Sequence, residues 1–352
     1  MPWFTARTAS VDSFHFSSIA GRYVLLLFYG SASTEPAHQA LELVRAHRRL
    51  FDDAKVCFFG VSFDPADRGK ACTREAVPGL RFFQDHDFAI ARLYGAVGRP
   101  AAGQDDGTLL YRPFWLLLDP MLRVIDIAPL TEGPAMMRRV EALPAVPAHA
   151  GPELHAPVLL LPRVFEPEFC AALIAAYEAD GGSESGFMRE VDGMTIGVHD
   201  PRHKRRRDFT LNDPELREGA RKRIEARLVP EIRKAFQFSA TRLERYLVAC
   251  YDSAVGGHFR AHRDNTTKGT AHRRFAVTIN LNAEDFTGGD LRFPEFGPRS
   301  YRAPTGGAVV FSCSLLHEAM PVRSGRRYAF LPFLYDEAGA RLREENRKYL
   351  AS

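Results

Sequence analysis

Two histidines and one aspartate in the second half of the chain have the types and spacing of a metal site. His262 and Asp264 are two residues apart, and His317 follows more than fifty residues later. Residues two apart point to the same side of a β-strand, so His262 and Asp264 could face one ion. Two imidazoles and one carboxylate fill one face of an octahedral metal and leave three positions open, which suits non-haem Fe(II). Two distant strands must then lie together to bring His317 to the pair.

An arginine ten residues after His317 offers a partner for a carboxylate. The guanidinium of Arg327 can bind a carboxylate through two parallel hydrogen bonds. A metal beside such a group is what a keto-acid co-substrate requires. Arg326 is the rival for this role, because neighbouring residues of a simple strand point to opposite faces.

The segments that must position these residues are typical of short strands separated by glycine turns. Glycine pairs such as Gly288–Gly289 interrupt the sequence at intervals and indicate turns. The runs between them are rich in β-branched and aromatic residues and predict strands at 275–282, 308–311 and 328–334. Several short strands between turns predict an α+β C-terminal domain with a double-stranded β-helix, or jelly-roll, core.

Five motifs in this half carry a family resemblance. They are Leu247-Val-Ala-Cys-Tyr251, His262-Arg-Asp-Asn265, Gly288-Gly-Asp-Leu-Arg-Phe-Pro294, His317-Glu318 and Arg327-Tyr-Ala329. Together they resemble the signatures of Fe(II)/2-oxoglutarate dioxygenases of the prolyl-hydroxylase group, over roughly residues 155–340. The resemblance implies Fe(II) at His262, Asp264 and His317, with 2-oxoglutarate at Arg327. It also implies O₂-dependent hydroxylation of an aliphatic C–H, on a protein or peptide by analogy, with release of succinate and CO₂.

The same resemblance suggests three further co-substrate residues. Tyr251 lies where the resembling hydroxylases place a tyrosine hydroxyl on the co-substrate, although a core aromatic is an equal alternative. Asn280 aligns with a second contact position that is tyrosine in the oxygen-sensing enzymes, and Thr278 points the same way by the two-residue period. The register of Arg327-Tyr-Ala favours Arg327 over Arg326. Ascorbate is a candidate additional cofactor.

Residues 11–145 alternate between predicted strands and helices, which favours an α/β layer fold. Continuous apolar runs predict buried strands at 23–29 and 56–62, and a hairpin joins 114–118 to 122–126. Helical spacing predicts helices at 37–51 and 135–143.

This first half resembles the thioredoxin-fold peroxiredoxins, in motifs that include Gly60-Val-Ser-Phe-Asp-Pro65 and Arg112-Pro-Phe114. That family places its peroxidatic cysteine three residues after a threonine. Counting from Thr34, the position is Ala37, so the nucleophilic thiolate is missing. The resemblance also makes Pro113 a candidate cis-proline. We therefore expect a domain without peroxidase activity that serves folding, docking or substrate presentation.

A proline-rich stretch at 144–152 predicts a linker, which gives domains at 1–150 and 151–352. The length of 352 residues agrees with two domains. The second domain should begin with helices at 167–179 and 215–236, the latter interrupted or restarted at Pro230.

Composition favours a cytoplasmic protein. No apolar run reaches transmembrane length and we expect no secretory signal, so no membrane partner is predicted. Five scattered cysteines suit a reducing compartment. The net charge of +4 is mild and does not favour nucleic acid. The basic run Arg202–Arg207 is interpreted as a solvated loop, with a rim that attracts an acidic substrate as the alternative.

Two other functions remain open at this stage, as do the substrate's identity and the oligomeric state. Two histidines and a carboxylate also suit catalytic zinc, in which case Glu318 could act as the base of a hydrolase. A non-catalytic sensor or adaptor, in which the first domain docks a partner, is the alternative suggested by the missing thiolate.

Overall fold

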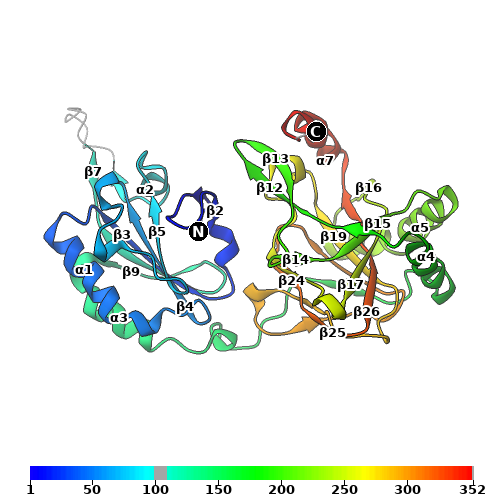
Figure 1. Cartoon of the computed structure of the whole chain (residues 1–352), viewed down its shortest axis with the longest axis horizontal. Helices are drawn as coiled ribbons and strands as arrows, with labels where there is room; N and C mark the ends of the chain where they lie inside the picture. Colours follow the sequence, from blue (N-terminus) through cyan, green and yellow to red (C-terminus); the bar gives the residue numbers. More distant parts are fainter. Residues whose placement is uncertain (99–108, 351–352) are drawn as a thin grey trace. The chain divides into compact units, whose positions relative to one another are not determined.

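The computed structural model describes residues 1–98 and 109–350, and the chain divides into two units (Figure 1). The first unit comprises residues 1–155 with 294–297, and the second comprises residues 156–293 with 298–352. The boundary expected near residue 150 stays a prediction. Among the described residues, no helix has both the length and the apolar content needed to cross a bilayer.

A five-stranded sheet forms the centre of the first unit, in the order β5-β4-β3-β8-β9. Strands β3, β4 and β5 are parallel, and β8 and β9 complete the sheet in antiparallel pairings. Every residue of β3 and β4 is buried, which explains their continuous apolar sequences. The strands are β3 (Tyr23–Gly30), β4 (Val56–Ser62), β5 (Leu80–Gln84), β8 (Phe114–Leu118) and β9 (Val124–Pro129).

Helices α1 (Glu35–Ala46) and α3 (Gly133–Glu141) lie along one face of this sheet (Figure 1). Their apolar residues share one buried cluster with Phe58 and Trp115 of the sheet. In a separate aromatic cluster of this unit, the ring centroids of Phe16 and Phe59 are 6.5 Å apart. The unit therefore has the layered α/β arrangement that its alternating sequence predicts, with the shorter helix α2 (Ala89–Leu93) on the chain between β5 and β8.

The expectation of a cis bond before Pro113 is wrong. The cis peptide bond among the described residues is Val77–Pro78, immediately before β5. Arg112 instead donates its backbone N–H to the carbonyl of Ala96 at 2.7 Å, so the chain approaches β8 in a paired, extended segment. The sequence motif around Pro113 does not reveal this pairing.

A nine-stranded antiparallel sheet is the larger sheet of the second unit. Its main path runs β10-β23-β19-β26-β17-β15-β11, with β16 and β27 paired beside it. The strand expected at 328–334 is two strands, separated at Leu331–Pro332, because proline cannot donate to the ladder. The strands are β10 (Leu159–Leu161), β11 (Ser183–Glu184), β15 (Arg207–Thr210), β16 (Arg242–Glu244), β17 (Leu247–Asp252), β19 (Phe275–Asn280), β23 (Ala308–Ser312), β26 (Arg326–Phe330) and β27 (Phe333–Tyr335).

A five-stranded sheet packs against the inner face of the larger one. Its order is β14-β18-β24-β21-β22. Tyr251 of the larger sheet shares a buried cluster with Phe259 and Ala319 of the smaller, so the two inner faces meet. The strands are β14 (Lys204–Arg205), β18 (His258–His262), β21 (Leu291–Arg292), β22 (Ser300–Tyr301) and β24 (His317–Ala319).

Three helices cover the outer face of the larger sheet. They are α4 (Pro167–Asp180), α5 (Pro214–Arg227) and α6 (Val229–Phe236). Strand β17 shows the alternation that results: Val248 and Cys250 pack towards the helices, whereas Tyr251 packs inwards. The break expected near Pro230 is present, since α5 ends at Arg227 and α6 restarts at Val229.

A hairpin, a short strand pair and a last helix complete the second unit. The hairpin is formed by β12 (Phe187–Val191) and β13 (Met194–Val198), and the strand pair by β20 (Thr287–Gly288) and β25 (Val322–Ser324). Helix α7 (Glu337–Glu345) follows β27.

Gly306 is the turn residue whose replacement should most disturb the second unit. Its φ is +73°, and an added Cβ would lie 2.1 Å from the carbonyl oxygen of Phe165. Gly306→Ala should lower the free energy of unfolding by about 3 kcal/mol or more, from left-handed strain plus overpacking. Denaturant unfolding measures this.

Gly181→Ala is the matched control, because Gly181 has φ +84° with nothing within 4 Å of an added Cβ. Gly181→Ala should lower the free energy of unfolding by only about 1–2 kcal/mol, because it adds left-handed strain without a close contact. Equal costs for the two variants would contradict the close approach at Gly306.

Candidate metal centre

The pairing of β18 with β24 brings His262 opposite His317. The two residues are register partners, and their ring centroids are 4.3 Å apart. Asp264 lies just past the end of β18, with one carboxylate oxygen 3.5 Å from Nε2 of His262 and the other 3.3 Å from Nε2 of His317. One ligand atom from each of the three residues lies within 4.8 Å of the others. The structure thus gathers the three side chains that the sequence singled out.

Both imidazoles are oriented by their own backbone. Nδ1 of His262 lies 2.7 Å from the carbonyl of Arg260, and Nδ1 of His317 lies 3.0 Å from the carbonyl of Leu315. A carbonyl only accepts, so each Nδ1 carries the proton and each Nε2 keeps its lone pair for the shared point. Metal-bound histidines are commonly held in this way. The donor set therefore fits Fe(II).

The charge states of the cluster also suit a cation. Burial, with a further contribution from the neighbouring His317, lowers the pKa of His262 to about 4, so His262 is neutral at pH 7. Burial would raise the pKa of Asp264, but the imidazoles of His317 and His262 outweigh it and hold that pKa well below its usual range. The anionic carboxylate of Asp264 and the neutral imidazole of His262 therefore face the same space.

Asp264 is held in place by groups that sequence reasoning missed. Its backbone N–H donates to the carbonyl of Cys313 at 3.0 Å, and its carbonyl accepts from Arg273 at 3.4 Å. Arg273 in turn donates to the buried carboxylate of Glu244 at 2.6 Å. Glu244 lies on β16, twenty residues before the ligand, so no local pattern indicated this support.

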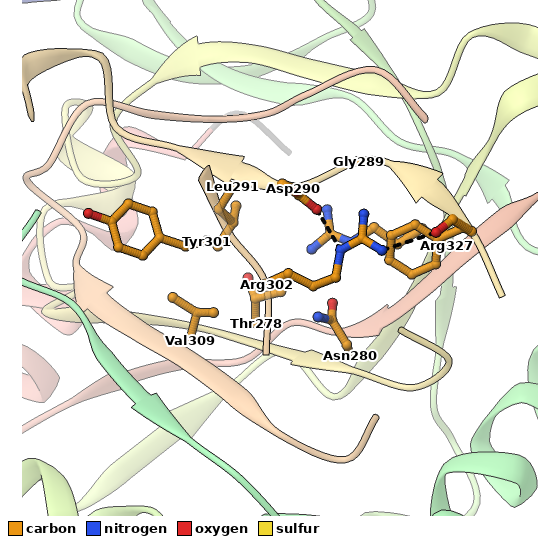
Figure 2. A pocket seen from close by; sticks show the side chains of 10 residues that line it. Thr278, Asn280, Gly289, Asp290, Leu291, Tyr301, Arg302, Val309 and Arg327 are labelled. Atoms are coloured by element: carbon orange, nitrogen blue, oxygen red, sulfur yellow. Dashed lines mark hydrogen bonds and ion pairs between the residues drawn. The ribbon is translucent and has the colours of Figure 1, made fainter. Parts of the chain in front are cut away.

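A small pocket between the two sheets contains Arg327, Thr278 and Asn280 (Figure 2). Arg327 is 3% exposed, and its Nη1 has no hydrogen-bond partner. Arg326 points the other way and pairs with Asp252 at 3.0 Å, at the surface. Strand alternation therefore places Arg327, and not Arg326, where a buried carboxylate could reach it.

Tyr251 supports Arg327 and is absent from the residues that line the pocket. The two are register partners on β17 and β26, and the Arg327 guanidinium carbon lies 5.1 Å from the centroid of the Tyr251 ring. The Tyr251 hydroxyl accepts a hydrogen bond from Arg206 at 3.3 Å. The geometry favours a positioning role, and direct contact with a co-substrate stays a prediction.

Asn280 offers an acceptor to the pocket. Its Nδ2 donates to the carbonyl of Ala303 at 2.7 Å, which leaves Oδ1 buried and without a partner. An acceptor suits the guanidinium of Arg327 and repels a carboxylate. Thr278, which is 5% exposed, supplies a hydroxyl that can donate.

Arg302 and Asp290 form one wall of the pocket and were not expected from the sequence (Figure 2). Arg302 donates to Asp290 at 2.6 Å and to the carbonyls of Ala283 and Phe286 at 3.0 Å. Arg302 also donates to the carbonyl of Gly288, which ties it to the glycine pair at 288–289. Arg302 follows β22, and only the fold brings it to this glycine pair, so spacing alone gave no signal.

The basic run at 202–207 was expected to be a solvated loop, but only part of it is exposed to solvent. Lys204 lies on β14 and is 7% exposed, and Arg206 is 8% exposed. Both therefore face the interior of the second unit, while Arg205 and Arg207 are exposed. The strand period of two divides the run between inside and outside.

No cysteine in the chain presents an accessible thiol, since all five are buried and free. Ala37, at the position of the missing peroxidatic residue, is 0% exposed. Burial raises the pKa of Cys57 to about 12, which disfavours the nucleophilic thiolate.

Family models match both halves of the chain. Residues 246–335 match the 2OG-Fe(II) oxygenase superfamily, and residues 1–123 match the AhpC/TSA family. The chain thus carries a 2OG-Fe(II) oxygenase domain after an AhpC/TSA domain, as the resemblances predicted.

Individual relatives cover only parts of the chain. A PKHD-type hydroxylase of Synechococcus is 30% identical over 89 residues, which are 24% of this chain and 39% of that protein. This chain therefore spans about two-fifths of the curated relative it matches. A Trichoplax adhaerens prolyl hydroxylase structure, with a hypoxia inducible factor peptide, has 18% identity and a TM-score of 0.41, covering 53% of this chain and 86% of that one. Xanthomonas campestris peroxiredoxin Q has 19% identity and a TM-score of 0.33, covering 40% and 90%.

Removal of either His262 or Asp264 should abolish metal binding. His262→Ala and Asp264→Ala each remove one of three ligands, so Fe(II) affinity should fall by more than about 100-fold. This exceeds the loss expected when only a residue that orients a ligand is replaced. Metal content after anaerobic loading and gel filtration measures this.

His258→Ala is the matched control, because His258 lies on the same strand but is bonded to the carbonyl of Gly256 at 2.7 Å, outside the cluster. Its metal content should equal that of the unaltered protein. Full loading of the Asp264→Ala protein would show that the cluster is not the metal site.

Proposed function

We propose that the second unit is an Fe(II)- and 2-oxoglutarate-dependent hydroxylase built on a jelly-roll core. The observation that carries this proposal is the joint presence, between the same two sheets, of the three-residue ligand cluster and a buried guanidinium nitrogen without a partner. A buried unpaired cationic group is costly, and the distal carboxylate of a keto acid would satisfy it.

The chain's own residues then have separate tasks. His262, Asp264 and His317 hold the ion, and Arg327 with Thr278 binds the distal carboxylate. When bound, Fe(II) with 2-oxoglutarate supplies the chemistry by which O₂ hydroxylates a C–H bond, with release of succinate and CO₂. The rings of Phe259 and Phe311, at 3.5 and 4.6 Å from the histidine rings, exclude water from the ligand side chains.

The substrate proposed on this basis is an aliphatic C–H group, prolyl in a protein or peptide by analogy with the hydroxylases matched. The first unit would then serve docking or substrate presentation. Peroxide reduction is disfavoured there by Ala37 and by the buried state of Cys57 and Cys72.

The zinc hydrolase alternative loses support from the position of Glu318. Its carboxylate pairs with Arg292 at 2.5 Å, so it is engaged beside the cluster and is not free as a general base. The sensor alternative predicts ligand binding without turnover, and succinate formation separates it from the hydroxylase.

Arg327→Met should abolish 2-oxoglutarate binding, whereas Arg326→Met should not. Loss of a charge-assisted pair of hydrogen bonds to a buried carboxylate costs about 3 kcal/mol, or about 100-fold in Kd. Calorimetric titration of 2-oxoglutarate into zinc-loaded protein measures the affinity, and succinate formation by the iron-loaded protein measures turnover.

Arg326 is a matched control, because it is adjacent, equally charged and exposed. An unaltered protein that binds metal but neither binds 2-oxoglutarate nor forms succinate would overturn the proposed function. Equal losses in the two variants would instead overturn the assignment of Arg327.

A further inference from the structure

Lys204 reaches the inner face of the second unit beside the metal ligands. It is the register partner of Phe259, and its Nζ lies 4.8 Å from the centroid of that ring. The same ring stacks on His262, with 3.5 Å between centroids. One aromatic ring therefore contacts both the ammonium group and a metal ligand.

Three cations share one carboxylate in this region. Lys204, Arg206 and Arg245 all act on Asp208. Arg206 donates a hydrogen bond to each carboxylate oxygen of Asp208, both at 2.6 Å, so its charge is fully paired. Arg245 reaches one of these oxygens only at 3.5 Å. Arg245 is thus only weakly paired, and Lys204 has no ion pair among the described residues.

Lys204 has only neutral hydrogen-bond partners. Its ammonium donates to Oγ of Ser185 at 2.7 Å and to the carbonyl of Gly186 at 2.6 Å. Within the described part of the chain, no carboxylate forms an ion pair with it. Burial, followed by the positive charge of Arg206, lowers the pKa of Lys204 to about 6. An anion bound beside Lys204 would raise this pKa and hold the side chain in its charged form at pH 7.

Arg245 lies in the short connection between β16 and β17 and is partly exposed to solvent. Its side chain is 30% exposed, and its guanidinium carbon lies 5.3 Å from the centroid of Phe333. A guanidinium held on an aromatic face presents a planar fork that matches a carboxylate.

We infer that Lys204 and Arg245 bind a carboxylate of the substrate, next to the metal centre. The inference rests on the proposed hydroxylase function and narrows its substrate to molecules with a carboxylate near the carbon that is oxidised. Arg206 does not take part, because Asp208 and the hydroxyl of Tyr251 already occupy its donors. The substrate carboxylate would supply the counter-charge that Asp208 does not provide.

The test uses the full chain loaded with zinc and 2-oxoglutarate, so that the Arg327 pocket is filled. Acetate and phosphate are titrated at constant ionic strength against chloride, and the melting temperature is followed. Acetate should raise Tm saturably in the unaltered protein. Lys204→Met and Arg245→Met should each weaken the apparent acetate affinity by at least about 10-fold, the loss of one charged contact.

Arg202→Met is the matched control from the same basic run, since the Arg202 side chain is 91% exposed, and its acetate response should be unchanged. Lys204→Arg, which keeps the charge, should retain a response and guards against a folding defect in Lys204→Met. The same Tm rise in the unaltered, Lys204→Met and Arg245→Met proteins would overturn the inference, as would a response to phosphate without one to acetate.

Two peptide probes distinguish the sources of the carboxylate. N-acetyl-prolyl-glutamate α-amide carries it on a side chain, and N-acetyl-prolyl-alanine carries it at the C-terminus. Tighter binding of either than of N-acetyl-prolyl-glutamine amide supports the inference, and equal binding of all three overturns it. Calorimetric binding of 2-oxoglutarate to the same samples reports on the proposed function separately, so the two failures can be told apart.

Discussion

The short pairing of β18 with β24 is the constraint on which the site depends. It sets His262 opposite His317, and a register irregularity between Phe259 and His262 lets Phe259 stack on the ligand that follows it. A shift of one residue would turn both imidazoles to the other face, because side chains alternate along strands. Every other feature of the site is placed relative to this pair: Asp264 continues from β18, and the pocket with Arg327 lies between the same two sheets.

The space between the two sheets of the second unit also buries several basic side chains. Arg327, Arg206 and Lys204 all face the space between the sheets with less than one-tenth of their surface exposed. Tyr251 links two of them, because Arg327 lies over its ring and Arg206 donates to its hydroxyl. Burying charges is expensive unless partners are supplied, and only Arg206 has a complete one in Asp208. Arg327 and Lys204, which lack a complete ionic partner, mark the places where a negatively charged ligand would be most stabilised.

Sequence reasoning succeeded where the chemistry is local and failed where the fold supplies it. The alternation of Arg326 and Arg327 is a strand property, so which of the two is buried could be predicted. Asp264 lies past the end of β18, so its approach to His262 comes from the chain beyond the strand and not from strand alternation. The donor of Asn280, by contrast, is taken by the backbone of Ala303, and no spacing reveals a contact of that kind. The basic run was misjudged for the same reason, since its composition favours solvent while its pairing with β18 places Lys204 inside.

The first unit has a packing residue at the position where the resembling family places its reactive cysteine. Ala37 is fully buried in the cluster that joins α1 to the sheet, together with Leu41 and Trp115. A small apolar residue there contributes to packing, whereas a thiolate at the same point would be desolvated and therefore disfavoured. The position is part of the core of the first unit, and its side chain contributes to packing. The metal-ligand cluster and the buried cations lie instead in the second unit, where they face one interior.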